Sequence, residues 1–339
     1  MRVASGIRNA YVIAIGLACA ALLPTSSARA ADGCTLPALS PGWSTVTVQS
    51  GNTSRNVRLY VPVSAVSHSD LPLVFDLHGS GGNGQSQARH SGLATQADRH
   101  DFLLANPDGG IADPKSPTDH FYWNIPGVPL IGTVPMPANP PDEVQFFRDA
   151  IRAIGQSACL DAHRIYVTGF SGGARMASLL ACELADRIAA IAPVAGLRAG
   201  VPRAGDFTTP ETSTCTPQRA MPIITFHGVH DPTNRYDGDG GPRWGYSVPV
   251  ALDRWANLDG CRTTASQQKL SAHVTRVSYP GCRNSAELIL YRTDASLEHG
   301  GGHVWPHPTG SQSSDSEVEA VDQLDASALI WEFFARHRS

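Results

Sequence analysis

One short segment carries a serine in a setting that suits nucleophilic chemistry. Residues 164–170 read Arg-Ile-Tyr-Val-Thr-Gly-Phe, and Ser171 follows before Gly172, Gly173 and a helix-compatible apolar stretch. This pattern is typical of a nucleophile elbow, in which a tight turn between a strand and a helix exposes the serine hydroxyl. Glycines at 169 and 173 fit because a Cβ at either position would crowd the strained backbone of the serine. The segment predicts acyl transfer through Ser171, with an oxyanion held by free N–H groups of the helix's first turn.

An acid follows Ser171 at the place where this kind of hydrolase carries one. Residues 222–228 (Pro-Ile-Ile-Thr-Phe-His-Gly) read as a strand, and Asp231 stands on the loop that leaves it. Functional groups of parallel sheets collect at the carboxyl ends of strands, so we predict Asp231 as the acid. Asp237 and Asp239 are the alternatives, on a Gly-rich stretch typical of a solvated turn.

The predicted base is His303. An apolar run at 287–291 reads as the next strand, and three glycines then lead to His303. A histidine on such a loop can take the serine proton and return it to the leaving group. His299 and His307 are the close alternatives, and their spacing of four from His303 also suits zinc on a helix face. The glycines and Pro306 argue against a helix, so no metal is predicted.

A second glycine-rich loop lies upstream. The apolar run 71–78 ends in His78 and continues as Gly-Ser-Gly-Gly-Asn-Gly at 79–84. In hydrolases with such a loop, one of its backbone N–H groups joins that of the residue after the nucleophile in the oxyanion hole. We therefore predict the backbones of Ser80 and Gly172 as donors. The loop also matches the dinucleotide pattern G-x-G-x-x-G, but the next run lacks the ribose-binding acid, so no cofactor is predicted.

The first thirty residues are typical of a secretory signal peptide. They carry Arg2 and Arg8, an apolar stretch from Tyr11 to Leu23, and an Ala-Arg-Ala cleavage site at 28–30. The apolar stretch is shorter than a membrane span of about 20 residues, so a secreted protein without a membrane anchor is predicted. The formal net charge is −4, and a negative protein does not attract nucleic acid or anionic membranes.

The cysteine content points to disulfides. The chain has 7 cysteines, and Cys19 lies in the predicted leader, which leaves an even number in an exported protein. Cys261 and Cys282 flank an apparent strand excursion and are the predicted pair. The connectivity of Cys34, Cys159, Cys182 and Cys215 stays open, and Cys182 also fits a plain buried thiol.

The order of apolar runs predicts an α/β fold with a mostly parallel central sheet flanked by helices, as one domain spanning 31–339. Hairpin-like strands at 45–48 and 57–61 come first, and a helix near 318–336 comes last. A trypsin-like Gly-x-Ser-Gly-Gly would require all-β barrels instead. The Pro-rich, aromatic segment 113–141, which includes Trp123, fits either a surface loop or a wall of a substrate cleft.

Together these motifs resemble a known family over nearly the whole mature chain. They are His78-Gly79-Ser80, the elbow at 169–173, Ala-Pro-Val-Ala-Gly at 192–196, His227-Gly228 with Asp231, and Gly-His-Val-Trp-Pro at 302–306. The combination is similar to that of secreted polyhydroxybutyrate depolymerase-like and feruloyl esterase-like (carbohydrate esterase family one) α/β-hydrolases. The resemblance implies hydrolysis of carboxylic esters by Ser171, Asp231 and His303 without a cofactor. It also implies that Trp305 lines the cleft.

Two positions depart from the family pattern. Many members have Asn at the position of Gly172 and Cys at the position of Ser80. The backbone N–H donors are the same with either residue. The resemblance implies an ester substrate, which can be polymeric, and favours feruloyl or acetyl esters of plant polysaccharide. A polyhydroxyalkanoate polyester is the alternative, and a secreted binding protein without turnover is the alternative of another class. No nucleic-acid or membrane partner is predicted, and the oligomeric state stays open.

Overall fold

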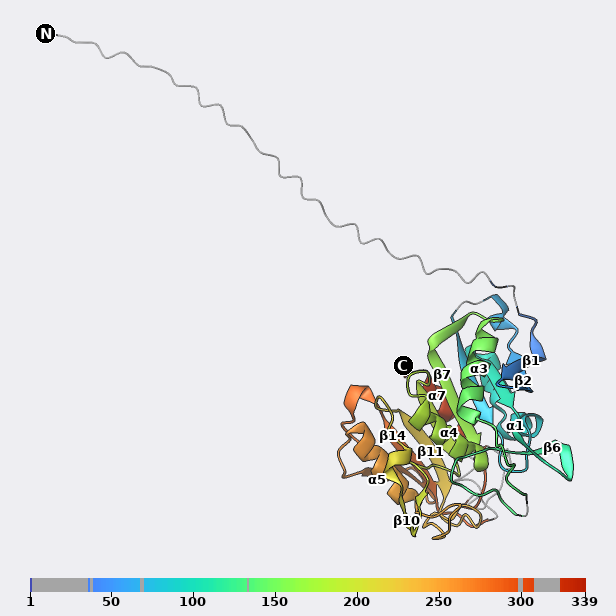
Figure 1. Ribbon diagram of the computed structural model, residues 1–339. Coiled ribbons are helices and arrows are strands. Elements are labelled where there is room, and N and C mark those ends of the chain that lie inside the picture. Colours follow the sequence, from blue (N-terminus) through green and yellow to red (C-terminus); the bar gives the residue numbers. More distant parts are fainter. Residues whose placement is uncertain (2–35, 37–38, 68–69, 133, 298–300, 308–323) are drawn as a thin grey trace. The chain divides into compact units, whose positions relative to one another are not determined.

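The apolar runs of the sequence form one large sheet in the computed structural model (Figure 1). The structure describes residues 1, 36, 39–67, 70–132, 134–297, 301–307 and 324–339. Within Cys34–Ser339, which form one compact unit, the ten-stranded sheet has the order β1-β2-β4-β3-β7-β8-β11-β14-β13-β12. The predicted signal peptide at 1–30 lies outside the described residues, Met1 apart.

The elements have the following bounds. The sheet strands are β1 (Gly42–Ser50), β2 (Thr53–Val61), β3 (Leu71–Leu77), β4 (Leu103–Pro107), β7 (Leu160–Phe170), β8 (Ala190–Val194), β11 (Ile223–Gly228), β12 (Ser266–Lys269), β13 (Val274–Tyr279) and β14 (Leu288–Thr293). Two small hairpins pair β5 (Ile111–Asp113) with β6 (Ser116–Tyr122), and β9 (Pro202–Arg203) with β10 (Asp206–Pro210). The helices are α1 (Gly84–Ser91), α2 (Leu93–His100), α3 (Glu143–Gly155), α4 (Gly172–Glu183), α5 (Val248–Asp259) and α7 (Ala326–Phe334), with short 3-10 turns η1 (Ser64–Ser67), η2 (Thr212–Thr214) and η3 (Arg283–Ser285).

The centre of the sheet is parallel from β4 through β3, β7, β8 and β11 to β14. The edge strands β1, β2, β13 and β12 pair antiparallel. Every residue of β3 and of β11 is buried, as expected for strands covered on both faces. The predicted mostly parallel sheet flanked by helices is confirmed.

Two core clusters sandwich the sheet, because side chains alternate between its faces along each strand. Phe75 packs against Phe147 of α3 and belongs to the cluster that includes residues of α4 and α5, whereas its neighbour Val74 belongs to the cluster that includes residues of α7 and α2. The parallel strands all end at one edge. The loops that follow β3, β7, β11 and β14 therefore leave the sheet on the side where α/β enzymes carry their sites.

Several details differ from the sequence-based predictions. The last described helix begins at Ala326, capped by Asp325, and residues 308–323 lie outside the described part. Segment 113–141 is not wholly irregular, because its start belongs to the β5–β6 hairpin. The antiparallel edge made by β12 and β13 was not predicted, because β12 is exposed and polar throughout. Among the described residues, no helix has the length and hydropathy to cross a membrane.

The disulfides tie helices to the loops beside them. Cys261, just after α5, bonds Cys282, just after β13, which confirms the predicted pair around the β12–β13 hairpin. Cys182 of α4 bonds Cys215, so its interpretation as a plain thiol is wrong. Cys159 is disulfide-bonded as well.

Removal of the buried crosslink between Cys182 and Cys215 should destabilise the fold. The pair closes a loop with a sequence separation of 33, for which the chain-entropy description gives about 3.7 kcal/mol. The double variant Cys182→Ala/Cys215→Ala should therefore unfold several degrees lower in a thermal melt. An unchanged melting temperature under oxidising conditions would show that the crosslink does not stabilise the native state.

Candidate active site

Ser171 sits at the turn between β7, which ends at Phe170, and α4, which begins at Gly172. Its backbone has φ 53° and ψ −110°, a conformation that non-glycine residues rarely adopt and that stores strain. The Ser171 N–H donates to the Val194 carbonyl at 2.9 Å, and the Arg175 N–H donates to the Ser171 carbonyl at 3.1 Å. The serine is thereby fixed at the carboxyl end of β7, with the first turn of α4 directly behind it.

The glycines around Ser171 are required by close packing. A Cβ at Gly169 would lie 2.7 Å from the carbonyl carbon of Gly173. A Cβ at Gly173 would collide with the carbonyl oxygen of Leu77 at the end of β3. The close contacts thus lie between β7, α4 and β3, and not at the serine itself as predicted from the sequence.

Asp231 and His303 come together although 72 positions separate them. The imidazole Nδ1 of His303 lies 2.7 Å from Oδ2 of Asp231, which is 3% exposed. The other carboxylate oxygen, Oδ1, accepts backbone N–H groups of Thr233 and Asn234, both at 2.8 Å. Because a carboxylate only accepts, we infer that Nδ1 carries a proton and that Nε2 keeps its lone pair.

His227 is a neighbour of this pair that the sequence analysis named only as part of the family motif His227-Gly228, without a role in the site. Its Nε2 lies 2.8 Å from the Asn234 carbonyl and 3.5 Å from Oδ2 of Asp231. Both neighbours are acceptors, so Nε2 carries the proton. Burial lowers the pKa of His227 well below its usual value, which keeps the ring neutral. Its sequence signals were its place on the predicted strand before Asp231 and its place in that motif.

The position of His303 relative to Ser171 follows from Phe170. The rings of Phe170 and His303 have centroids 4.7 Å apart, so the histidine packs against the residue that precedes the serine. Within the described part of the chain, Ser171 Oγ makes no hydrogen bond. Catalytic hydrogen bonds are often loose without substrate, so this geometry is compatible with proton transfer between the two.

The backbone N–H groups of Ser80 and Gly172 lie beside each other. A Cβ built on Gly172 would stand 2.9 Å from the Ser80 backbone nitrogen. Neither amide donates a hydrogen bond within the described residues, and both residues line one pocket with Trp123. Two unpaired donors that face a pocket next to a candidate nucleophile can bind a developing oxyanion.

His78 fixes the loop that carries Ser80. The Gly109 N–H donates to His78 Nε2 at 2.9 Å, so Nδ1 is protonated and donates to the Gly79 carbonyl at 2.8 Å. Trp123 donates from its indole nitrogen to the His78 carbonyl at 2.8 Å. Burial lowers the pKa of His78 to about 4, so the ring stays neutral at neutral pH.

The buried, neutral His78 predicts acid-sensitive stability. An unfolded histidine has a pKa of about 6.5, so between that value and about 4 the unfolded chain binds the proton more readily than the folded one. His78 therefore lowers the free energy of unfolding as pH falls from about 6.5 towards 4. The variant His78→Gln, whose amide oxygen can accept from Gly109, should lose less stability on acidification, by up to about 3 kcal/mol. Parallel curves of unfolding free energy against pH for the two proteins would refute this.

The other predicted residues are exposed, lie in the core or fall outside the described residues. Asp237 and Asp239 are exposed, and so is His307, while His299 lies outside the described residues. Trp305 is 2% exposed and donates from its indole nitrogen to Ser327 of α7 at 3.0 Å. It packs in the core cluster of α7, whereas Trp123, also buried, has an edge on the pocket next to Ser80.

Comparisons with known proteins find relatives that are named as esterases or as a depolymerase. No family model matches the chain. It is 27% identical over 254 residues to NocK of Nocardia uniformis subsp. tsuyamanensis, which is named as a candidate esterase, and covers 66% of it with 70% of its own length. It is 32% identical over 170 residues to feruloyl esterase B of Piromyces equi, which matches 48% of this chain and 29% of that protein. Poly(3-hydroxyalkanoate) depolymerase C of Paucimonas lemoignei is 26% identical over 148 residues, 43% of this chain and 33% of that protein.

The chain is a distant homologue of these esterases. It spans less than two thirds of the length of each of these three relatives. Among solved structures, an acetyl xylan esterase from Aspergillus awamori superimposes with a TM-score of 0.55 at 18% identity, over 83% of this chain and 98% of that one. This likeness confirms the predicted α/β-hydrolase fold of this chain.

Proposed function

We propose that this protein is a serine esterase that cleaves carboxylic esters through an acyl-enzyme on Ser171. One observation carries the proposal: the hydrogen bond from His303 to the buried Asp231, with His303 packed against the residue before the elbow serine. The esterase homologues support the same reaction class. Asp231 and His303 stand on separate loops, and a purely structural role would not require them to meet beside Ser171.

In the proposed mechanism, Ser171 Oγ attacks the ester carbonyl while Nε2 of His303 takes its proton. The imidazolium that forms is stabilised by Asp231, which holds the ring through Nδ1. His303 then returns the proton to the departing alcohol. A water molecule, deprotonated by the same nitrogen, releases the acid from Ser171.

The oxyanion of each tetrahedral intermediate is assigned to the backbone N–H groups of Ser80 and Gly172. Their free donors are fixed before substrate arrives, so little reorganisation is needed at the transition state. The loss of one such donor typically costs about 3 kcal/mol of transition-state stabilisation. The packing of His78 and Trp123 under the loop supports this assignment, because it holds Ser80 in place.

For the substrate we favour feruloyl or acetyl esters of plant polysaccharide. The names of feruloyl esterase B and of the acetyl xylan esterase support this class. The pocket beside Ser80 and Gly172 also has apolar walls from Leu130 and Ile131, which suits an apolar acyl group. A polyester is the second candidate, supported by the match to a polyhydroxyalkanoate depolymerase.

We also propose that the protein acts outside the cytoplasm. The leader-like sequence at 1–30 and the disulfides at Cys182–Cys215 and Cys261–Cys282 support export, because such bonds persist in oxidising compartments.

A substrate panel on the purified protein tests the substrate class. Methyl ferulate, acetylated xylan, hydroxybutyrate oligomers and p-nitrophenyl esters of increasing chain length should be compared by kcat/KM. Preference for methyl ferulate or acetylated xylan would support the polysaccharide assignment. Preference for hydroxybutyrate oligomers would transfer the assignment to polyesters, and no turnover of any ester would refute the esterase proposal.

A further inference from the structure

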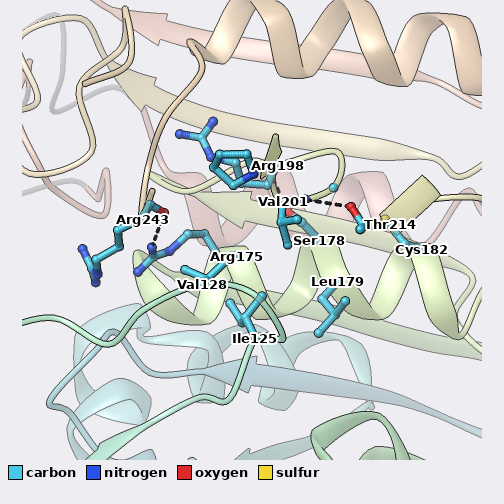
Figure 2. Close-up of a pocket in the computed structure, with 12 residues that line it drawn as sticks. Ile125, Val128, Arg175, Ser178, Leu179, Cys182, Arg198, Val201, Thr214 and Arg243 are labelled. Atoms are coloured by element: carbon cyan, nitrogen blue, oxygen red, sulfur yellow. Dashed lines mark hydrogen bonds between the residues drawn. The ribbon is translucent and has the colours of Figure 1, made fainter. Parts of the chain in front are cut away.

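A pocket next to the candidate active site has three arginines in its wall (Figure 2). Arg175 lies on α4, Arg198 follows β8, and Arg243 lies on the loop before α5. Figure 2 shows the guanidinium group of Arg198 at the top and those of Arg175 and Arg243 at the left, with Ile125 and Leu179 below. The cavity thus combines an apolar body with a cationic end.

Two of these arginines are buried, and all three lack matching charges among the described residues. Arg175 and Arg198 are each 5% exposed. In the described part of the chain no carboxylate forms an ion pair with them or with Arg243. The Nε atoms of all three, and Nη2 of Arg198, are buried and have no hydrogen-bond acceptor in the described protein. Buried cations and donors are costly unless something pairs with them, so this arrangement calls for an anionic partner.

Arg198 presents donors in the shape that a carboxylate fits. Its Nη1 donates to the Leu197 carbonyl at 3.1 Å, and its Cζ lies 3.1 Å from the ring centroid of Trp244 and 4.5 Å from that of Tyr246. The unpaired atoms, Nε and Nη2, are the two donors of one guanidinium edge. Such an edge binds both oxygens of a carboxylate at once.

The charges around the pocket also favour an anionic ligand. Burial, and then the charges of Arg243 and Arg198, lower the pKa of Arg175. Burial lowers the pKa of Arg198 to about 9, so it is still a cation at neutral pH. The acidic group that acts on these arginines is Asp239, which is exposed and whose Oδ1 accepts the backbone N–H groups of Gly241 and Gly245.

We propose that this pocket binds a free carboxylate carried by the ester substrate, recognised by Arg175, Arg198 and Arg243. Because hydrolysis at Ser171 is itself proposed above, this assignment rests on it. It requires an ester with an acidic end and so favours the second candidate class, because hydroxyalkanoate oligomers end in a free carboxylate whereas methyl ferulate and acetylated xylan do not. Arg243 connects the two places, since its Nη2 donates to Ser80 Oγ at 3.3 Å. The pocket that contains Ser80 and Gly172 also shares Arg175 and Arg243 with the arginine pocket, so the carboxylate lies a few bonds from the scissile carbonyl.

Two matched substrate pairs test the assignment and locate the carboxylate. Monomethyl glutarate and its amide differ only by an acyl-side charge, and 3-acetoxybutyrate and its amide differ only by an alcohol-side charge. In one pair the acid should have a kcat/KM about tenfold or more above that of the amide, as expected for a charge-assisted pair. Acid-to-amide ratios near one in both pairs would overturn the proposal.

The arginine variants should remove this preference. Arg198→Met and Arg175→Met should bring the acid-to-amide ratio towards one. Arg243→Met, whose side chain is partly exposed, provides the same test if a buried variant fails to fold. The control Arg187→Met removes an equal charge from an exposed site just before the amino end of β8 and should keep the wild-type ratio. A ratio that survives in the pocket variants would show that the arginines only support the fold.

Binding to a catalytically inactive protein separates this proposal from the proposed esterase function. Glutarate and 3-hydroxybutyrate should be titrated into Ser171→Ala and into Ser171→Ala/Arg198→Met by calorimetry. Binding that is weakened about tenfold or more by the second substitution supports the pocket even if no ester is hydrolysed. Absence of binding by both acids, in a protein that hydrolyses neutral esters, refutes the pocket and leaves the esterase intact.

Discussion

The variant Ser171→Ala should lose ester hydrolysis by roughly 10⁴-fold or more, because no other group on the proposed path can form the acyl-enzyme. The residual rate would come from substrate binding and the oxyanion donors. Steady-state kinetics with a p-nitrophenyl ester measures the loss. The fold should persist, since Ser171 Oγ makes no hydrogen bond within the described residues and its removal leaves no buried group unpaired.

The matching check is the thermal unfolding temperature of Ser171→Ala, which should be close to that of the wild type. A protein that melts normally and still turns over ester at more than a few per cent of the wild-type rate would place the nucleophile elsewhere.

The variant Asp231→Asn should lower kcat by about 10⁴-fold with the fold retained. The carboxylate accepts from His303 Nδ1, Thr233 and Asn234. An amide can keep the backbone contacts through its oxygen but turns its NH₂ towards Nδ1. The imidazole would then carry its proton on Nε2 and could not act as a base.

The control for this variant is Asp237→Asn, which changes the exposed alternative acid on the Gly-rich stretch. Its kcat should remain near the wild-type value. If the two variants behave in the same way, Asp231 is not the acid of this site.

Local sequence signals were sufficient to predict the strand, the turn and the helix that position Ser171. The apolar run, the glycines and the helix-compatible stretch around Ser171 all describe one strand, one turn and one helix, and β7 and α4 meet there. Asp231 and His303 could be chosen because loops at the ends of parallel strands converge at one sheet edge. Their hydrogen bond then follows from the topology.

The remaining features depend on contacts between residues that no regular spacing in the sequence connects. The arginine pocket is built from one helix and two loops, which carry Arg175, Arg198 and Arg243. Only Arg175 could be noticed in the sequence, as a charged residue within the mostly apolar helix α4. Trp305 was expected in the cleft from the family resemblance, but its indole meets Ser327, which no pattern connects with it. The edge strand β12 is polar and exposed throughout, so it lacks the alternation by which strands are predicted.

Covalent labelling tests the central claim most directly. The purified protein should be treated with a fluorophosphonate, and its peptides should be analysed by mass spectrometry. The proposed mechanism predicts one phosphonylated residue, Ser171, with labelling that is strongly slowed in Asp231→Asn. Absence of adduct at Ser171 in a folded protein, or modification of a different serine that accounts for the loss of activity, would contradict it.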